Sequence, residues 1–131
     1  MVNASYAGGN AVPLVMRDHT KLKAFDLADS LALAVYQHTR SFPKEELFGL
    51  TAQLRRAAVS VPSNMVEGCA RHSEADYLRF LDIAYASSRE VDYQLSLAVR
   101  LGYLEPGPHR ELAARCAETS KVLAGLIRAL R

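Results

Sequence analysis

Residues 77 to 98 repeat apolar or small side chains at alternating intervals of four and three residues. The seven positions are Tyr77, Leu81, Ala84, Ser88, Val91, Leu95 and Ala98. This spacing places all of them along one side of an α-helix, in the pattern of helices that pack side by side. Ser73 precedes the segment as an N-cap and Gly102 follows it as a C-terminal stop. We therefore predict a helix over residues 74–101, about 40 Å long.

Three further segments have the same kind of periodicity. They cover residues 21–40, with Thr20 as N-cap, residues 50–69, and the stretch that follows the stop at residues 105–108. The connections between them are short, and short connections force neighbouring helices to be antiparallel. The 131 residues suffice for a single domain, and no strand pattern competes. The fold class predicted is all-α, an up-down-up-down antiparallel four-helix bundle.

Pro62 lies inside the second periodic segment. A proline there removes the hydrogen bond to the carbonyl of Ala58 and clashes with it, at a cost of about 3 kcal/mol or more. The apolar register nevertheless continues beyond the proline, to Met65 and Cys69. We therefore expect one helix, kinked near Pro62, in which polar side chains satisfy the freed backbone groups. Ser60, Ser63 and Asn64 are the candidates for that role.

The N-terminal residues differ from the rest of the chain. Residues 1–20 hold Gly, Asn, Ser and Pro without any period, so we expect a disordered arm before a bundle domain over residues 21–131. No basic stretch precedes an apolar one at the start, and no apolar run is long enough to span a membrane. The expected location is the cytoplasm, with no membrane partner.

The first helix segment is apolar over more than one stripe. One stripe contains Phe25, and a second one beside it contains Leu27 and Leu31. A single bundle core needs only one stripe, so the additional apolar surface predicts contact with another molecule. Phe25, Leu27 and Leu31 are the predicted oligomer interface.

No motif for catalysis, a cofactor or a metal is present. The phosphate-binding, dinucleotide-binding and nucleophile-elbow patterns are all absent, and the Glu-x-x-His tetrad of di-iron bundles is missing. His19, His38, His72 and His109 have no partner ligand at helical spacing. Two cysteines lie far apart, as reduced packing residues do. We expect no enzyme activity, no cofactor and no metal.

Charge is segregated along the chain, although the net charge is only +2. Residues 1–49 are neutral, residues 50–71 carry +2, residues 72–105 carry −3 and residues 106–131 carry +3. Three interpretations remain open. The helices can exchange surface ion pairs, the charges can join different subunits in a closed ring, or the Arg side chains can bind phosphates.

The stretch from Phe48 to Gly68, FGLTAQLRRAAVSVPSNMVEG, resembles the bacterial four-helix-bundle family named after the protein encoded in intervening sequences of 23S ribosomal RNA genes. Phe42-Pro43 before it and Leu101-Gly102-Tyr103-Leu104 near the end of the third segment also fit the family pattern. The resemblance covers about residues 22–130. Phe25 stands where the family often has Trp, and Ala86-Ser87-Ser88 stands where it often has Gly-Ser-Leu.

The resemblance implies an assembly. Members are similar to an accessory protein of diversity-generating retroelements, a ring of five bundles that presents basic surface to nucleic acid and to a reverse transcriptase. A homopentamer is therefore the expected state, with RNA or DNA and a partner protein as further candidate partners. The family name records where the gene was found, and most members have no assigned role.

The polar residues of this stretch can be interpreted physically. Arg55 and Arg56 are about 100° apart on a helix, so one can reach inward toward Glu67 or Glu90 while the other faces outward. A polar network that fixes helix register is predicted from Arg56, Ser60, Asn64, Glu67, Ser87 and Glu90. The candidates for nucleic-acid contact are Arg55, Arg56 and Arg71.

Two hypotheses of function follow from these observations. The first is a non-enzymatic homo-oligomeric bundle that binds nucleic acid through arginines of the second and fourth helices. The second is a protein-interaction scaffold whose arginines form ion pairs within the assembly and which binds no nucleic acid.

Overall fold

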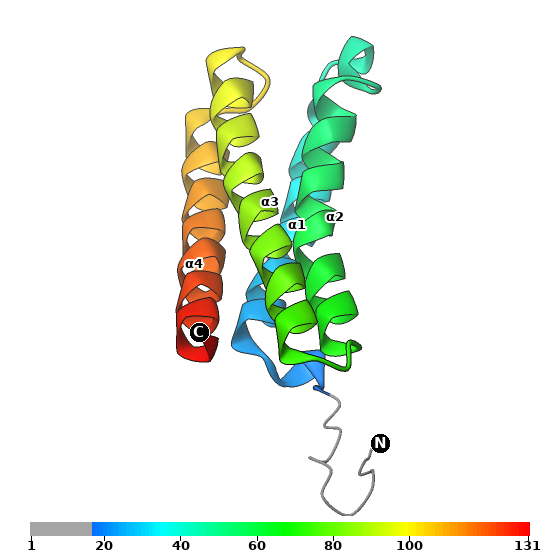
Figure 1. The fold of residues 1–131 in the computed structure, drawn as a ribbon. Helices are drawn as coiled ribbons and strands as arrows, with labels where there is room; N and C mark the ends of the chain where they lie inside the picture. The colour runs from blue at the N-terminus through cyan, green and yellow to red at the C-terminus, as the bar shows by residue number, and fades with distance from the viewer. Residues whose placement is uncertain (1–16) are drawn as a thin grey trace, which may run out of the picture.

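A computed structural model describes residues 17–131, and within them every regular element is helical. The four α-helices are α1 (Lys23–His38), α2 (Leu50–Cys69), α3 (Glu74–Arg100) and α4 (Pro106–Leu130). Three 3₁₀ turns accompany them: η1 (His19–Lys21), η2 (Thr39–Ser41) and η3 (Lys44–Glu46). Successive helices run in opposite directions and pack around one axis, so the up-down-up-down bundle is confirmed (Figure 1).

The helix ends follow from their capping residues. The Ser73 hydroxyl accepts a hydrogen bond from the Asp76 N–H at 3.0 Å and starts α3, as its sequence predicts. Gly102, with φ of 81°, ends α3 in the left-handed conformation that glycine adopts most easily. At the other end of the loop, Pro106 is the first residue of α4 and not part of a stop between helices. Its fixed φ and missing N–H are tolerated in the first helical turn.

The start of the bundle also differs from expectation. Helix α1 begins at Lys23, and its N-cap is Leu22, which supplies no side-chain hydrogen bond, so the prediction of Thr20 as N-cap is wrong. Thr20 belongs to η1, whose N-cap Asp18 accepts from the Thr20 N–H through its carboxylate. Arg17 forms an ion pair with Glu74 and stacks over the ring of Tyr77 at 4.0 Å. Residues 17–20 therefore pack on the end of the bundle, whereas the rest of the predicted arm, residues 1–16, lies outside the described residues.

Helix α2 continues through Pro62. Asn64 Nδ2 donates to the Ser60 carbonyl at 2.8 Å, so a polar side chain does supply a hydrogen bond to the backbone next to the proline. Pro62 itself is buried. The proline is thus accommodated by side-chain hydrogen bonding and by apolar packing of its ring.

The core consists of two apolar clusters with a hydroxyl layer between them. The upper cluster includes Leu54 and Leu95, and the lower one includes Met65 and Leu81. Between them the Ser88 hydroxyl lies 2.7 Å from that of Ser120 and also donates to the Tyr85 carbonyl. The hydroxyl that interrupts the apolar stripe of α3 is therefore fully paired, and it ties α3 to α4.

Both cysteines of the described chain are buried free thiols. Cys116 Sγ donates to the Ser88 carbonyl at 3.0 Å, and burial raises the pKa of this thiol to about 12. A thiol with so high a pKa is protonated near neutral pH and is a poor nucleophile.

Candidate functional site

Exposed apolar side chains gather along the seam between α1 and α2. Six of them define what we call the α1–α2 face: Leu33, Tyr36, Leu47, Phe48, Val59 and Val66. Leu33 is 60% exposed and Phe48 is 92% exposed. The face is hollowed into a shallow groove, whose floor includes Ala32, Ala52 and Pro62. A cluster of large, exposed apolar side chains is more typical of a surface that binds another molecule than of a surface that stays in contact with solvent.

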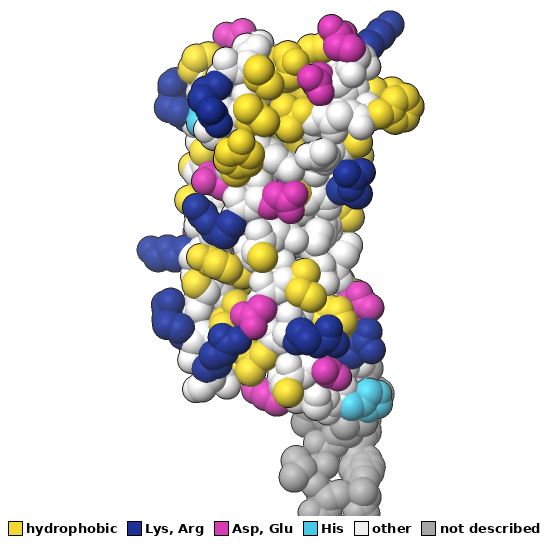
Figure 2. Space-filling view, turned by 45° about the horizontal axis from the view of Figure 1, so that its top comes forward, with side chains coloured by type: hydrophobic (Ala, Val, Ile, Leu, Met, Phe, Trp, Pro, Cys, Tyr) yellow, Lys and Arg dark blue, Asp and Glu magenta, His cyan; other side chains and the backbone are white. Residues whose placement is uncertain are grey.

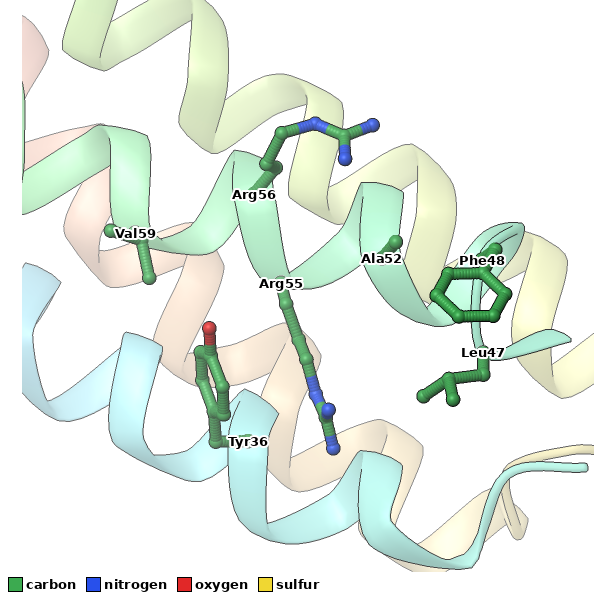
Figure 3. Close-up of a pocket in the computed structure, with 7 residues that line it drawn as sticks. All are labelled: Tyr36, Leu47, Phe48, Ala52, Arg55, Arg56 and Val59. Atoms are coloured by element: carbon green, nitrogen blue, oxygen red, sulfur yellow. The ribbon is translucent and has the colours of Figure 1, made fainter. Parts of the chain in front are cut away.

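Arg55 lies in the middle of this face and points toward α1 (Figure 3). Its Nε donates to Thr39 Oγ1 at 2.8 Å, and its guanidinium lies 4.8 Å from the centre of the Tyr36 ring. Thr39 Oγ1 in turn donates to the Val35 carbonyl at 2.8 Å, which fixes the acceptor. The arginine is thus held in place through Nε, while its two terminal nitrogens make no hydrogen bond or ion pair within residues 17–131.

Phe48 projects from a turn that is held by Glu46. The Glu46 carboxylate accepts from the Leu50 N–H at 3.0 Å, which caps the start of α2, and from the Tyr103 hydroxyl at 2.9 Å. These two hydrogen bonds, that of Leu50 first, hold the pKa of Glu46 below its usual range. The carboxylate is therefore charged at neutral pH, and it fixes the turn that presents Phe48 to solvent.

Leu33, Tyr36 and Phe48 were not predicted as interface residues. Of the three residues that were, Phe25 does line the groove beside Leu33. Leu31 is fully buried in the upper core cluster, so its expected contact with another copy is wrong. Leu27 is half-buried one helical turn before Leu31, on the same side of α1, and does not line the groove.

Arg56 projects from α2 on the side away from α1 (Figure 3). It lines a polar cleft between α2 and α3 with Ser60, Ser87 and Glu90. Within the described chain no hydrogen bond or ion pair joins Arg56 to Glu90, which instead accepts from Gln94 Nε2 at 3.1 Å. Arg56 is therefore exposed, with its charge available to another molecule.

The predicted polar network forms in part. The Ser60 and Ser87 hydroxyls lie 2.8 Å apart and connect α2 to α3, and Asn64 Nδ2 donates to the Ser60 hydroxyl at 2.9 Å. Within the described residues no hydrogen bond joins Glu67 to this group. Glu67 forms an exposed ion pair with Arg71 at 3.0 Å instead.

The three arginines proposed for nucleic-acid contact do not form one patch. Arg55 points toward α1 and Arg56 points away from it. Arg71 lies 16 residues beyond Arg55, about 24 Å along the helix, where it pairs with Glu67 and stacks over Phe80 at 4.8 Å. A continuous phosphate-binding track on α2 would need these side chains on one face.

The segregated charges of the sequence do not pair across helices as the simplest interpretation expects. Within residues 17–131, one ion pair joins α3 to the end of α4, Asp82 with Arg131 at 2.6 Å, and the Arg17–Glu74 pair joins the N-terminal segment to α3. Three others connect residues of the same helix, and the fourth joins Glu67 of α2 to Arg71 just beyond the end of that helix. On the face seen in Figure 2, basic and acidic side chains intermingle, and apolar ones gather toward the end of the bundle turned to the viewer.

The described residues hold neither a cluster of metal ligands nor a helix that could span a membrane. No group of three or more His, Cys, Asp or Glu side chains is placed to hold a metal ion. None of the helices within residues 17–131 combines the length and the hydropathy that crossing a membrane requires.

Comparison with known proteins gives one family and one fold. The family model described as 23S rRNA-intervening sequence protein matches residues 20–125. A crystal structure of a protein with unknown function from the S23 ribosomal protein family of Bacteroides thetaiotaomicron VPI-5482 superposes with a TM-score of 0.73. It has 24% sequence identity, and the match covers 80% of this chain and 95% of that one. No functionally curated protein matches the chain.

Proposed function

The chain belongs to the 23S rRNA-intervening sequence protein family, and from this premise we propose that it is a non-enzymatic interaction protein that assembles with copies of itself through the α1–α2 face. The observation that carries the proposal is the density of exposed apolar side chains on that face. No comparable set occurs on α4, none of whose large apolar residues is among the exposed ones of the described chain. The resemblance to ring-forming bundles favours five copies.

The chemistry of the face supports binding rather than catalysis. Its groove is lined chiefly by apolar side chains, with Asp29 as a carboxylate at one end and the guanidinium groups of Arg55 and Arg56 toward the other. The carboxylate lies far from the two arginines along the helices, so these charges do not converge on a point where a substrate could react. The face instead combines an apolar centre with a few charged groups, as protein interfaces do.

We expect Leu33→Glu to dissociate the assembly without unfolding the bundle. Leu33 is 60% exposed within one copy, so a carboxylate there is solvated in the monomer, but an assembled interface would bury it without a partner. Light scattering coupled to gel filtration should give several times 14.4 kDa for the wild type and 14.4 kDa for the variant.

The matched control is Ala117→Glu, which adds the same charge at an exposed position of α4. It should leave the mass of the assembly unchanged. A wild-type mass of 14.4 kDa at micromolar concentration would refute the proposal, as would a Leu33→Glu variant that keeps both the wild-type mass and the wild-type helical content.

Nucleic-acid binding is the second candidate function, and the free charge of Arg56 favours it. Of the three predicted arginines, Arg56 alone has neither an ion pair nor an aromatic partner within the described residues. If RNA binds, Arg56→Ala should weaken it more than Arg71→Ala and should lower the log–log salt slope by about 1. Fluorescence anisotropy with a labelled single-stranded RNA, at several salt concentrations, measures both. If no RNA binds at low salt, nucleic-acid binding is excluded and the protein-interaction scaffold is the one remaining candidate function.

A further inference from the structure

Helix α3 carries a second stripe of residues on its outer surface. Its members recur at intervals of three and four: Ile83, Ala86, Glu90, Tyr93, Leu97 and Leu101, at the C-terminal end of the helix. We call them the α3 ridge. Leu97 is partly buried, while the other five are exposed, Tyr93 to 59%. Five of the six are apolar, and although Leu97 also packs against the upper core cluster, the other apolar members of this coiled-coil-like seam are left exposed by the bundle.

The Ser60–Ser87 hydrogen bond sets the relative height of α2 and α3. Since the two helices are antiparallel, each step up α3 from Ser87 corresponds to a step back along α2 from Ser60. Glu90 is therefore level with Ala57, within about 3 Å of the height of Arg55. In the same way Leu97 is level with Leu50, the first residue of α2, and Leu101 lies beyond that level, at the end where the turn carries Leu47 and Phe48. At the lower end, Ile83 is level with Asn64, between Pro62 and Val66.

The ridge and the α1–α2 face therefore match when two copies stand side by side in the same orientation. The ridge from Ile83 to Leu101 is about 27 Å long, and the α2 side of the face from Leu50 to Val66 is about 24 Å long, with Phe48 beyond its end. Apolar groups face apolar groups at both ends. The charged member of the ridge, Glu90, reaches the height at which the face presents the terminal nitrogens of Arg55, which have no hydrogen-bond partner within residues 17–131. A helix lying in an apolar groove is a common form of protein recognition.

We propose that the α1–α2 face of one copy receives the α3 ridge of a second copy, with Glu90 of the second copy opposite Arg55. This inference rests on the proposed self-assembly and names its second surface. The two surfaces lie on adjacent sides of the bundle, and each copy offers both. The contact is therefore head-to-tail, and such contacts form a ring when the rotation from copy to copy closes, instead of stopping at a twofold dimer.

Charge reversal tests this pairing. Arg55→Glu places two carboxylates opposite each other, and Glu90→Arg places two guanidinium groups opposite each other. Each single variant should raise the dissociation constant of the assembly at least tenfold. The double variant Arg55→Glu/Glu90→Arg restores an attractive pair and should recover the wild-type mass by light scattering. Glu118→Arg, at an exposed position of α4, is the control and should have no effect.

Each outcome decides between the two proposals. If the single variants dissociate and the double variant recovers the mass, the pairing of Glu90 with Arg55 holds. If both single variants keep the wild-type mass, or the double variant stays dissociated while its circular dichroism and melting temperature match the wild type, the pairing is overturned. In either case, if Leu33→Glu dissociates the assembly, the proposed self-assembly through the α1–α2 face still holds. A wild-type protein that is monomeric refutes both the self-assembly and the pairing of Glu90 with Arg55.

Discussion

Leu31→Glu should unfold the protein, whereas the same change two residues along, Leu33→Glu, should leave the bundle folded. Leu31 has no solvent exposure and lies in the upper core cluster with Val35, Leu54 and Leu95. Substitution removes a buried leucine, at about 2–5 kcal/mol, and introduces a carboxylate whose burial without a partner costs several kcal/mol more. The total is comparable to the 5–15 kcal/mol that stabilise an ordinary domain.

Circular dichroism and thermal denaturation of the two variants measure the difference. Leu31→Glu should show little helix at 25 °C or a melting temperature far below that of the wild type. Leu33→Glu should keep the helical content. A folded Leu31→Glu variant that is merely dissociated would show that α1 is rotated relative to the structure, with Leu31 and not Leu33 on the outside.

This pair of residues also shows why the hydropathy pattern placed Leu31 on an outer surface, although it is fully buried within one copy. Two adjacent apolar stripes on α1 suggested one for the core and one for a partner. In the bundle, however, α1 packs against both α2 and α4, so a wide apolar arc is already needed within one copy. Hydropathy alone cannot distinguish an arc shared between two neighbouring helices from a core stripe beside an interface.

Periodicity predicted burial correctly on α3, where a single apolar stripe faces the core. All seven positions of the repeat in α3, from Tyr77 to Ala98, are buried. Because the repeat has seven positions, one unusual residue such as Ser88 does not hide it. Ser73 and Gly102 mark the two ends of the helix. The fold class therefore follows from spacing and capping, which act locally along the chain.

The candidate site depended on contacts that local patterns do not encode. Ser60, Asn64 and Ser87 were predicted to belong to one polar network that fixes helix register, and hydrogen bonds do join them. Spacing along α2 accounts for the contact of Ser60 with Asn64, whereas Ser87 reaches Ser60 from α3. Phe48 belongs to the family pattern, but that pattern did not predict that its side chain is exposed. Its exposure depends on the Glu46 carboxylate, which binds Leu50 and the distant Tyr103 hydroxyl. A contact between residues 57 positions apart leaves no periodic trace in the sequence.

The second large effect is expected for Leu81→Ala, in the lower half of the bundle. Leu81 is fully buried in the cluster that also contains Met65, Tyr77 and Leu123. The hydroxyl layer at Ser88 and Ser120 separates this cluster from the upper one, and the serine side chains are held by their own hydrogen bonds. They cannot move to fill a cavity without breaking those bonds, so the site has little freedom to collapse.

We therefore expect Leu81→Ala to lower the free energy of unfolding by about 2–5 kcal/mol, toward the upper part of that range. Urea denaturation followed by circular dichroism measures it, with Leu101→Ala as control because Leu101 is 51% exposed on the same helix. The control should lose less than about 1 kcal/mol in the monomeric Leu33→Glu background, where no partner covers the α3 ridge. Equal losses for the two leucines would mean that the lower cluster repacks freely, and that the hydroxyl layer does not hold the two halves of the core in register.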